Sequence, residues 1–86
     1  MDRLHNTLIA GCEPTRMKVL QTLGTGEFTA GRLAKIAGCS QPAMSHHLRI
    51  LRMTGLVTFE KRDRHCHYSL SERGGHFLEF FAKLEG

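Results

Sequence analysis

The sequence contains no apolar run long enough to cross a membrane, no low-complexity tract and no internal repeat. No secretory leader is recognisable at its start, where Met1–Leu8 is mostly polar. With 86 residues the chain has room for one domain, which we expect to span residues 1–86. These absences exclude a transmembrane helix and predict a single-domain cytoplasmic protein.

Signatures of catalysis are also missing. The chain has no glycine-rich phosphate loop, no pair of carboxylates in a recognisable pocket context, and no Cys–His or Ser–His arrangement in a supporting motif. A catalytic cleft is also difficult to build in so short a chain. We therefore expect a protein that is not an enzyme.

Cysteine and histidine are present, but their spacing does not suit a metal site. The three cysteines (Cys12, Cys39, Cys66) and six histidines show no CxxC or HExxH pattern. An odd number of cysteines without a secretion signal argues against a disulfide framework. His65 and His67 share one face of an expected strand but lack a third ligand nearby in sequence. The sequence predicts no metal and no other cofactor.

The most informative stretch is residues 40–57, which reads as a capped helix followed by a strand. Ser40 suits the N-cap, Pro42 suits the first turn, where its missing N–H costs nothing, and Gly55 suits the position after the helix. At about 100° per residue, the helix has a polar stripe in front of an apolar face. The stripe consists of Gln41, Ser45, Arg49 and Arg52 with His46 at its edge, and the apolar face of Met44, Leu48 and Leu51.

These polar side chains are of the types that read DNA. Glutamine offers an amide fork suited to adenine, arginine a fork suited to guanine or phosphate, and serine and histidine offer single hydrogen bonds. For an isolated amphipathic helix, a solvated surface is the alternative interpretation. The segment that follows favours DNA.

Two β-prone runs, residues 56–62 and 64–70, are joined around Asp63-Arg64 and predict a hairpin. Val57, Phe59, Cys66, Tyr68 and Leu70 take its inward positions, and Lys61, Arg62 and Arg64 crowd its turn. A helix-turn-helix followed by a basic hairpin is a winged helix. We therefore predict a mostly α fold with a small β-hairpin wing (α+β), whose cations contact the DNA backbone beside the groove.

The distribution of charge agrees with this interpretation. The whole chain has a formal net charge of +4, and residues 30–64 alone carry seven basic against two acidic side chains. The positive field therefore belongs to the helix-turn-helix and the wing, as nucleic-acid binding requires.

The remaining segments predict further helices around this unit. Leu4, Leu8 and Ile9 indicate a first helix, and a second runs from Pro14 to Gly24. A third, Ala30–Ala37, is expected to turn Leu33 and Ile36 toward the core, and Ser71 to cap a last helix.

The last helix is more apolar than one side of so small a domain can bury. Phe77, Phe81 and Leu84 recur at helical spacing beside Leu78 and Phe80. We predict a homodimer through the terminal helices, with an intramolecular cap as the alternative. The predicted interface residues are Leu4, Leu8, Phe77, Phe80, Phe81 and Leu84.

Together these pieces resemble the ArsR/SmtB family of bacterial metal- and stress-responsive repressors. The resemblance rests on Glu13–Arg16, on residues 38–48, on Leu51 and Gly55–Val57, and on a wing that ends in Tyr68–Leu70, so it covers roughly residues 8 to 70. It implies that the protein works as a dimer. It also implies groove contacts by Ser40, Gln41, Ser45 and His46.

The resemblance further implies that the family's usual metal sites are lost. Thr29 and Gly31 stand where several members carry thiolate ligands. The family's terminal-helix site needs an acid and a histidine upstream of His76 and Glu79, where this chain has Arg73 and Gly74 instead.

The sequence thus predicts a regulator, and specifically a repressor, that binds an inverted-repeat operator in double-stranded DNA as a homodimer. Its predicted DNA contacts are Ser40, Gln41, Ser45, His46, Arg49, Lys61, Arg62 and Arg64. A thiol-reactive effector could release it, with Cys12 as the candidate redox sensor because the first helix adjoins the expected dimer interface. The alternatives are a winged-helix protein-interaction module and a metal-responsive repressor with a non-standard His/Cys site.

Overall fold

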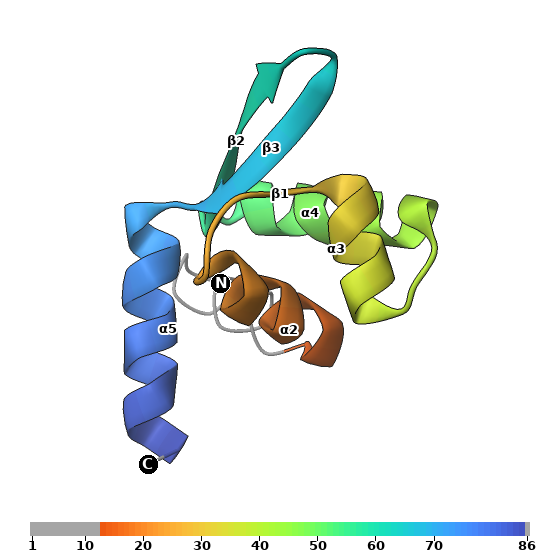
Figure 1. Cartoon of the computed structure of the whole chain (residues 1–86). Coiled ribbons are helices and arrows are strands. Elements are labelled where there is room, and N and C mark those ends of the chain that lie inside the picture. Colours follow the sequence, from red (N-terminus) through yellow and green to blue (C-terminus); the bar gives the residue numbers. More distant parts are fainter. Residues whose placement is uncertain (1–12, 86) are drawn as a thin grey trace.

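A computed structural model describes residues 13–85 and has seven elements in that range (Figure 1). In chain order they are α2 (Pro14–Leu23), β1 (Phe28–Thr29), α3 (Ala30–Ala37), α4 (Gln41–Met53), β2 (Val57–Arg62), β3 (His65–Leu70) and α5 (Glu72–Glu85). The predicted first helix with Leu4, Leu8 and Ile9, and the candidate sensor Cys12, lie outside the described residues. No helix within residues 13–85 is long and apolar enough to span a bilayer.

Local capping sets the starts of the helices. The Glu13 carboxylate accepts a 2.8 Å hydrogen bond from the Arg16 amide, and this bond lowers the pKa of Glu13. Thr29 caps α3 in the same way, and Ser40 caps α4 by accepting from the Ala43 amide at 3.2 Å. The predicted positions of these three helices are confirmed.

The wing is part of a three-stranded antiparallel sheet with strand order β1-β3-β2. The predicted hairpin is confirmed, with Val57 opposite Leu70 and a two-residue turn. Asp63 and Arg64 form this turn at φ values of 50° and 72°, the left-handed conformation that suits the twist of a hairpin. The strand β1, which pairs Phe28 with Tyr68, was not predicted, because two residues carry no readable alternation.

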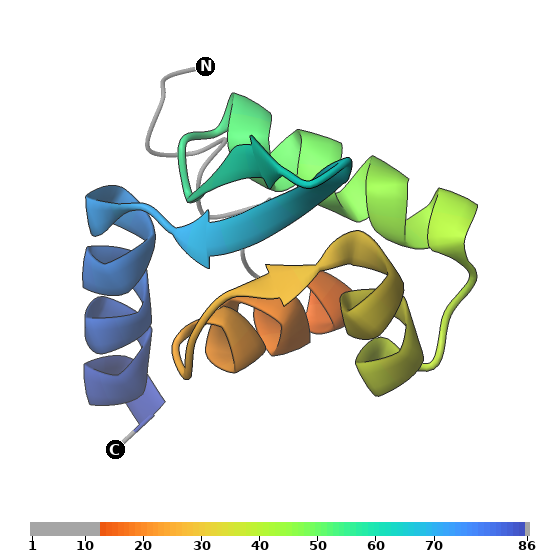
Figure 2. The ribbon, with the colours of Figure 1, turned by 45° about the horizontal axis from the view of Figure 1, so that its top comes forward.

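The core lies where α2, α3 and α4 meet the base of the sheet (Figures 1 and 2). Its most deeply buried large side chains are Val19, Leu20, Leu33, Met44, Leu48, Leu51 and Leu56. The prediction for Ile36 was wrong, because its side chain is 37% exposed and Ala34 is buried instead. The core direction of α3 lies between Leu33 and Ala34, and Ile36 points about 110° away from it.

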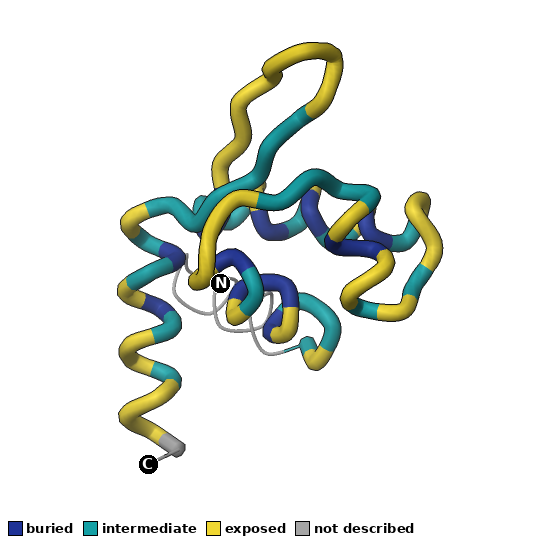
Figure 3. Tube along the Cα trace, in the orientation of Figure 1, coloured by how far each residue is buried: buried dark blue, intermediate teal, exposed yellow. Residues whose placement is uncertain are grey.

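The helix α5 follows β3, and its first turn packs against the turn between α4 and β2. Its later turns extend away from the body of the domain (Figure 3). The Ser71 hydroxyl accepts a 3.0 Å hydrogen bond from the Gly74 amide and donates to the carbonyl oxygen of Gly55, which confirms the predicted cap. Phe77 is only 7% exposed and stacks on Phe81 with 6.3 Å between ring centroids. The structure therefore corrects the assignment of Phe77 to a dimer surface, because its own chain already covers it. Phe80 and Leu84 remain 53% and 67% exposed.

Candidate nucleic-acid interface

The helix α4 has the two faces that the sequence predicts. Met44, Leu48 and Leu51 are at most 1% exposed. The five polar side chains of the stripe (Gln41, Ser45, His46, Arg49 and Arg52) are all exposed. A rigid helix therefore presents this stripe to solvent, on a core that fixes its orientation.

The N-terminal end of the stripe rests on α3. The Ser40 hydroxyl is committed to the cap of α4. A Cβ added to Gly31 would lie 3.2 Å from the Gln41 side-chain nitrogen, so the amide fork of Gln41 lies close to the start of α3. A shallow groove of about 550 Å³ separates the two helices here, and Arg32, Lys35 and half-buried Cys39 line it.

The C-terminal end of the stripe is attached to the wing. The Arg52 guanidinium lies 4.3 Å from the centre of the Phe59 ring, and that ring is 5.6 Å from the ring of Tyr68. Phe59 lies on the same face of the sheet as Val57, but the prediction that it points into the core was wrong, because it is 38% exposed and the Arg52 guanidinium, not the core, covers part of its ring. Arg52 therefore acts as a bridge between α4 and the sheet.

A groove of about 870 Å³ runs between α4 and the base of the wing, and Ser45 and Arg49 line its helix side. Tyr68 lines its sheet side, and partial burial raises the pKa of this phenol. A molecule that lies along the surface from α4 to the wing would therefore contact two arginines, Arg49 and Arg52, and two aromatic rings.

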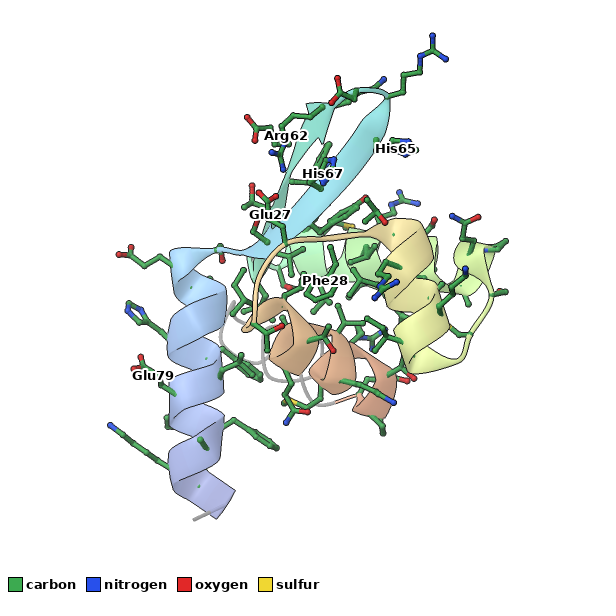
Figure 4. The ribbon with its side chains drawn as sticks, viewed as in Figure 1. Glu27, Phe28, Arg62, His65, His67 and Glu79 are labelled. Atoms are coloured by element: carbon green, nitrogen blue, oxygen red, sulfur yellow. The ribbon has the colours of Figure 1, made fainter. Side chains whose placement is uncertain are left out.

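The three predicted cations of the wing are exposed but not equivalent. Lys61 and Arg64 form no salt bridge with a described residue, whereas Arg62 forms two. Its guanidinium pairs with Glu27, which precedes β1 (Figure 4). It also lies 3.4 Å from the carboxylate of Glu60. Sequence reasoning missed this pair, because Glu27 and Arg62 are 35 positions apart in the chain.

Histidines and cysteines do not assemble into a ligand set in the described part of the chain. Within residues 13–85, no group of three or more His, Cys, Asp or Glu side chains is placed to hold a metal ion. His47 lies behind the stripe, half-buried, with its Nδ1 3.2 Å from an Arg16 guanidinium nitrogen. His65 and His67 lie on β3 in the wing (Figure 4).

Comparison with known proteins agrees with this geometry. A family model described as a helix-turn-helix domain matches residues 13–58. The transcriptional repressor SdpR of Bacillus subtilis is 35% identical over 68 residues, which are 79% of this chain and 76% of SdpR. The aligned part covers between 48% and 76% of the length of each of eight curated relatives.

Solved structures show the same fold. HlyU from Vibrio cholerae is 30% identical, with a TM-score of 0.84 over 95% of this chain and 90% of HlyU. The homodimeric winged helix-turn-helix domain of Mb0332 from Mycobacterium bovis, a possible ArsR-family regulator, is 20% identical with a TM-score of 0.85. That likeness covers 96% of this chain and 77% of the Mb0332 domain, and at this identity it shows the fold alone. The chain belongs to the ArsR/SmtB family of winged helix-turn-helix transcriptional regulators.

Proposed function

We propose that this protein is a transcriptional repressor that binds a specific double-stranded DNA sequence as a homodimer. The observation that carries the proposal is the exposed polar stripe of α4, which has a buried apolar face behind it and a basic wing beside it. Kinship with proteins named as transcriptional repressors supports the same role. Such a protein acts in the cytoplasm, where bacterial DNA lies, and needs no catalytic centre.

In the proposed complex, α4 enters the major groove and the wing follows the phosphate backbone. Gln41 and Ser45 contact base edges. Arg49, which lines the protein groove between α4 and the wing, contacts guanine or a phosphate. Lys61 and Arg64 contact phosphates, which position the protein without reading sequence.

The homodimer is proposed to form through the exposed part of α5. Phe80 and Leu84 leave large apolar side chains in solvent that a second copy would cover. Two recognition helices related by a two-fold axis read an inverted repeat whose half-sites are about one helical turn, roughly 10 bp, apart.

The test is whether the purified protein protects an inverted repeat upstream of its own gene from nuclease digestion. Light scattering on the same sample should show a dimer at micromolar concentration. A monomer with no preference for that repeat over random DNA would contradict the proposal, and would favour a winged-helix module that binds another protein.

A further inference from the structure

Arg62 of the wing is held by two carboxylates on the face of the sheet that points away from α4. In the antiparallel register, Glu60 and Arg62 alternate with Phe59 and Lys61, so they lie on the opposite face from the ring that contacts Arg52. Glu27 comes from the segment before β1 and pairs with the Arg62 guanidinium (Figure 4). Arg62 can therefore reach a phosphate only by leaving an existing anionic partner.

The ion pair between Arg62 and Glu27 is not needed to hold the wing in place. The backbone of β3 is hydrogen-bonded to β1 on one side and to β2 on the other. Arg52 and Phe59 also connect the wing to α4. The side chains of Arg62 and Glu27 are 46% and 47% exposed, and an exposed ion pair of this kind adds little to stability.

We propose that Glu27 is an internal competitor of DNA phosphate for Arg62 and so limits how tightly the wing holds DNA. A phosphate contact by a basic side chain releases a condensed counterion and adds about 0.9 to the slope of log K against log salt. While Arg62 is paired with Glu27, its contact with a DNA phosphate is only partly formed. This inference rests on the proposed DNA binding and goes beyond it by assigning Glu27 a role in setting the affinity of the wing for DNA.

The experiment measures the affinity of the full chain for a labelled random-sequence duplex at several salt concentrations. In Glu27→Gln, Arg62 keeps only the Glu60 carboxylate, 3.4 Å away. The slope is therefore expected to steepen by up to about 0.9 and affinity at low salt to rise several-fold, because Arg62 is more available to a phosphate. In the double variant Glu27→Gln/Arg62→Gln, the slope is expected to equal that of Arg62→Gln alone.

The control is Glu79→Gln, which removes the same charge from an exposed position on α5, away from the wing (Figure 4). This control measures how much of the gain in DNA affinity comes from the change in the net charge of the protein. The melting temperature of Glu27→Gln should stay within about 2 °C of the wild type, because the pair is exposed.

The outcomes separate the two proposals. If all the proteins bind DNA and Glu27→Gln has the same slope as Glu79→Gln, the competitor role is wrong and DNA binding stands. A steepening that survives in the double variant overturns it as well, because Arg62 is then not the group released. If none of the proteins binds DNA, the proposed function fails and the role of Glu27 fails with it.

Discussion

At the scale of single residues, the two adjacent glycines of α5 have different roles. A Cβ added to Gly74 would overlap the carbonyl oxygen of Leu56, whereas a Cβ added to Gly75 would have no heavy atom within 4 Å. Gly74 thus allows the first turn of α5 to approach the backbone of the α4–β2 turn. At Gly75 a side chain would have room, so the missing Cβ there only adds backbone freedom to the helix.

We expect Gly74→Ala to lower the free energy of unfolding by about 1–3 kcal/mol or more, because backbone atoms must move apart. Gly75→Ala should raise it by about 0.5–1 kcal/mol, because alanine loses less backbone entropy in a helix. Denaturant unfolding of the two variants measures both effects. Equal stability of the two would contradict the close approach seen at Gly74.

Residues of the stripe and of the wing tip should differ in how they affect DNA affinity. Gln41→Ala or Ser45→Ala is expected to cost about 1–3 kcal/mol on the operator and little on random DNA, because a base contact is lost. Arg64→Ala should weaken binding to both DNAs alike and reduce the salt slope by about one. Fluorescence anisotropy with both duplexes checks this. A change of base preference in Arg64→Ala alone would mean that the proposed docking is wrong.

At the scale of secondary-structure elements, one cation adds to the apolar contact between α4 and the base of the wing. Arg52 lies over Phe59, and its charge also favours the ionised form of the neighbouring Tyr68 phenol, although burial has the larger effect and raises the pKa. A neutral side chain at position 52 therefore changes both the packing of the wing and the titration of the phenol.

We expect Arg52→Met to lower the free energy of unfolding by about 0.5–1 kcal/mol, the usual size of an exposed cation–π contact. It should also raise the pKa of Tyr68 further, because the nearby positive charge is gone. Ultraviolet titration measures this directly, since Tyr68 is the only tyrosine of the chain. Arg49→Met is the matched control, because it removes a cation from the same stripe, and no ring contact of Arg49 is found among the described residues. Equal effects of the two variants would exclude a special role for Arg52.

At the scale of the whole molecule, two phenylalanines of α5 should separate folding from assembly. Phe77 completes the core, so Phe77→Ala should cost about 3–5 kcal/mol of stability. Phe80 is half exposed, so Phe80→Glu should leave the fold intact and shift a dimer toward monomer. Thermal unfolding and light scattering at several concentrations measure the two effects. A Phe80→Glu variant that remains a dimer at low micromolar concentration would place the dimer interface elsewhere.

The sequence by itself determined the features that depend on local interactions, whereas only the tertiary structure decided those that depend on contacts between distant segments. The extent of α4, its Ser40 cap, its polar stripe and the tight turn at Asp63 follow from interactions between residues a few positions apart. These features, the basic charge of residues 30–64 and the family resemblance were sufficient to predict a winged helix with its candidate DNA-binding surface.

Interactions between distant segments could not be predicted in this way. Periodicity placed Ile36 toward the core, but the direction of the core was set by the packing of α3 on α2 and α4, and it favoured Ala34. Nothing near Arg62 in the sequence indicates that Glu27 pairs with it, and nothing near Phe77 indicates that this ring, unlike Phe80, belongs to the core of its own chain. Only the folded chain decides such pairings, because they depend on the relative positions of elements that local propensity leaves free.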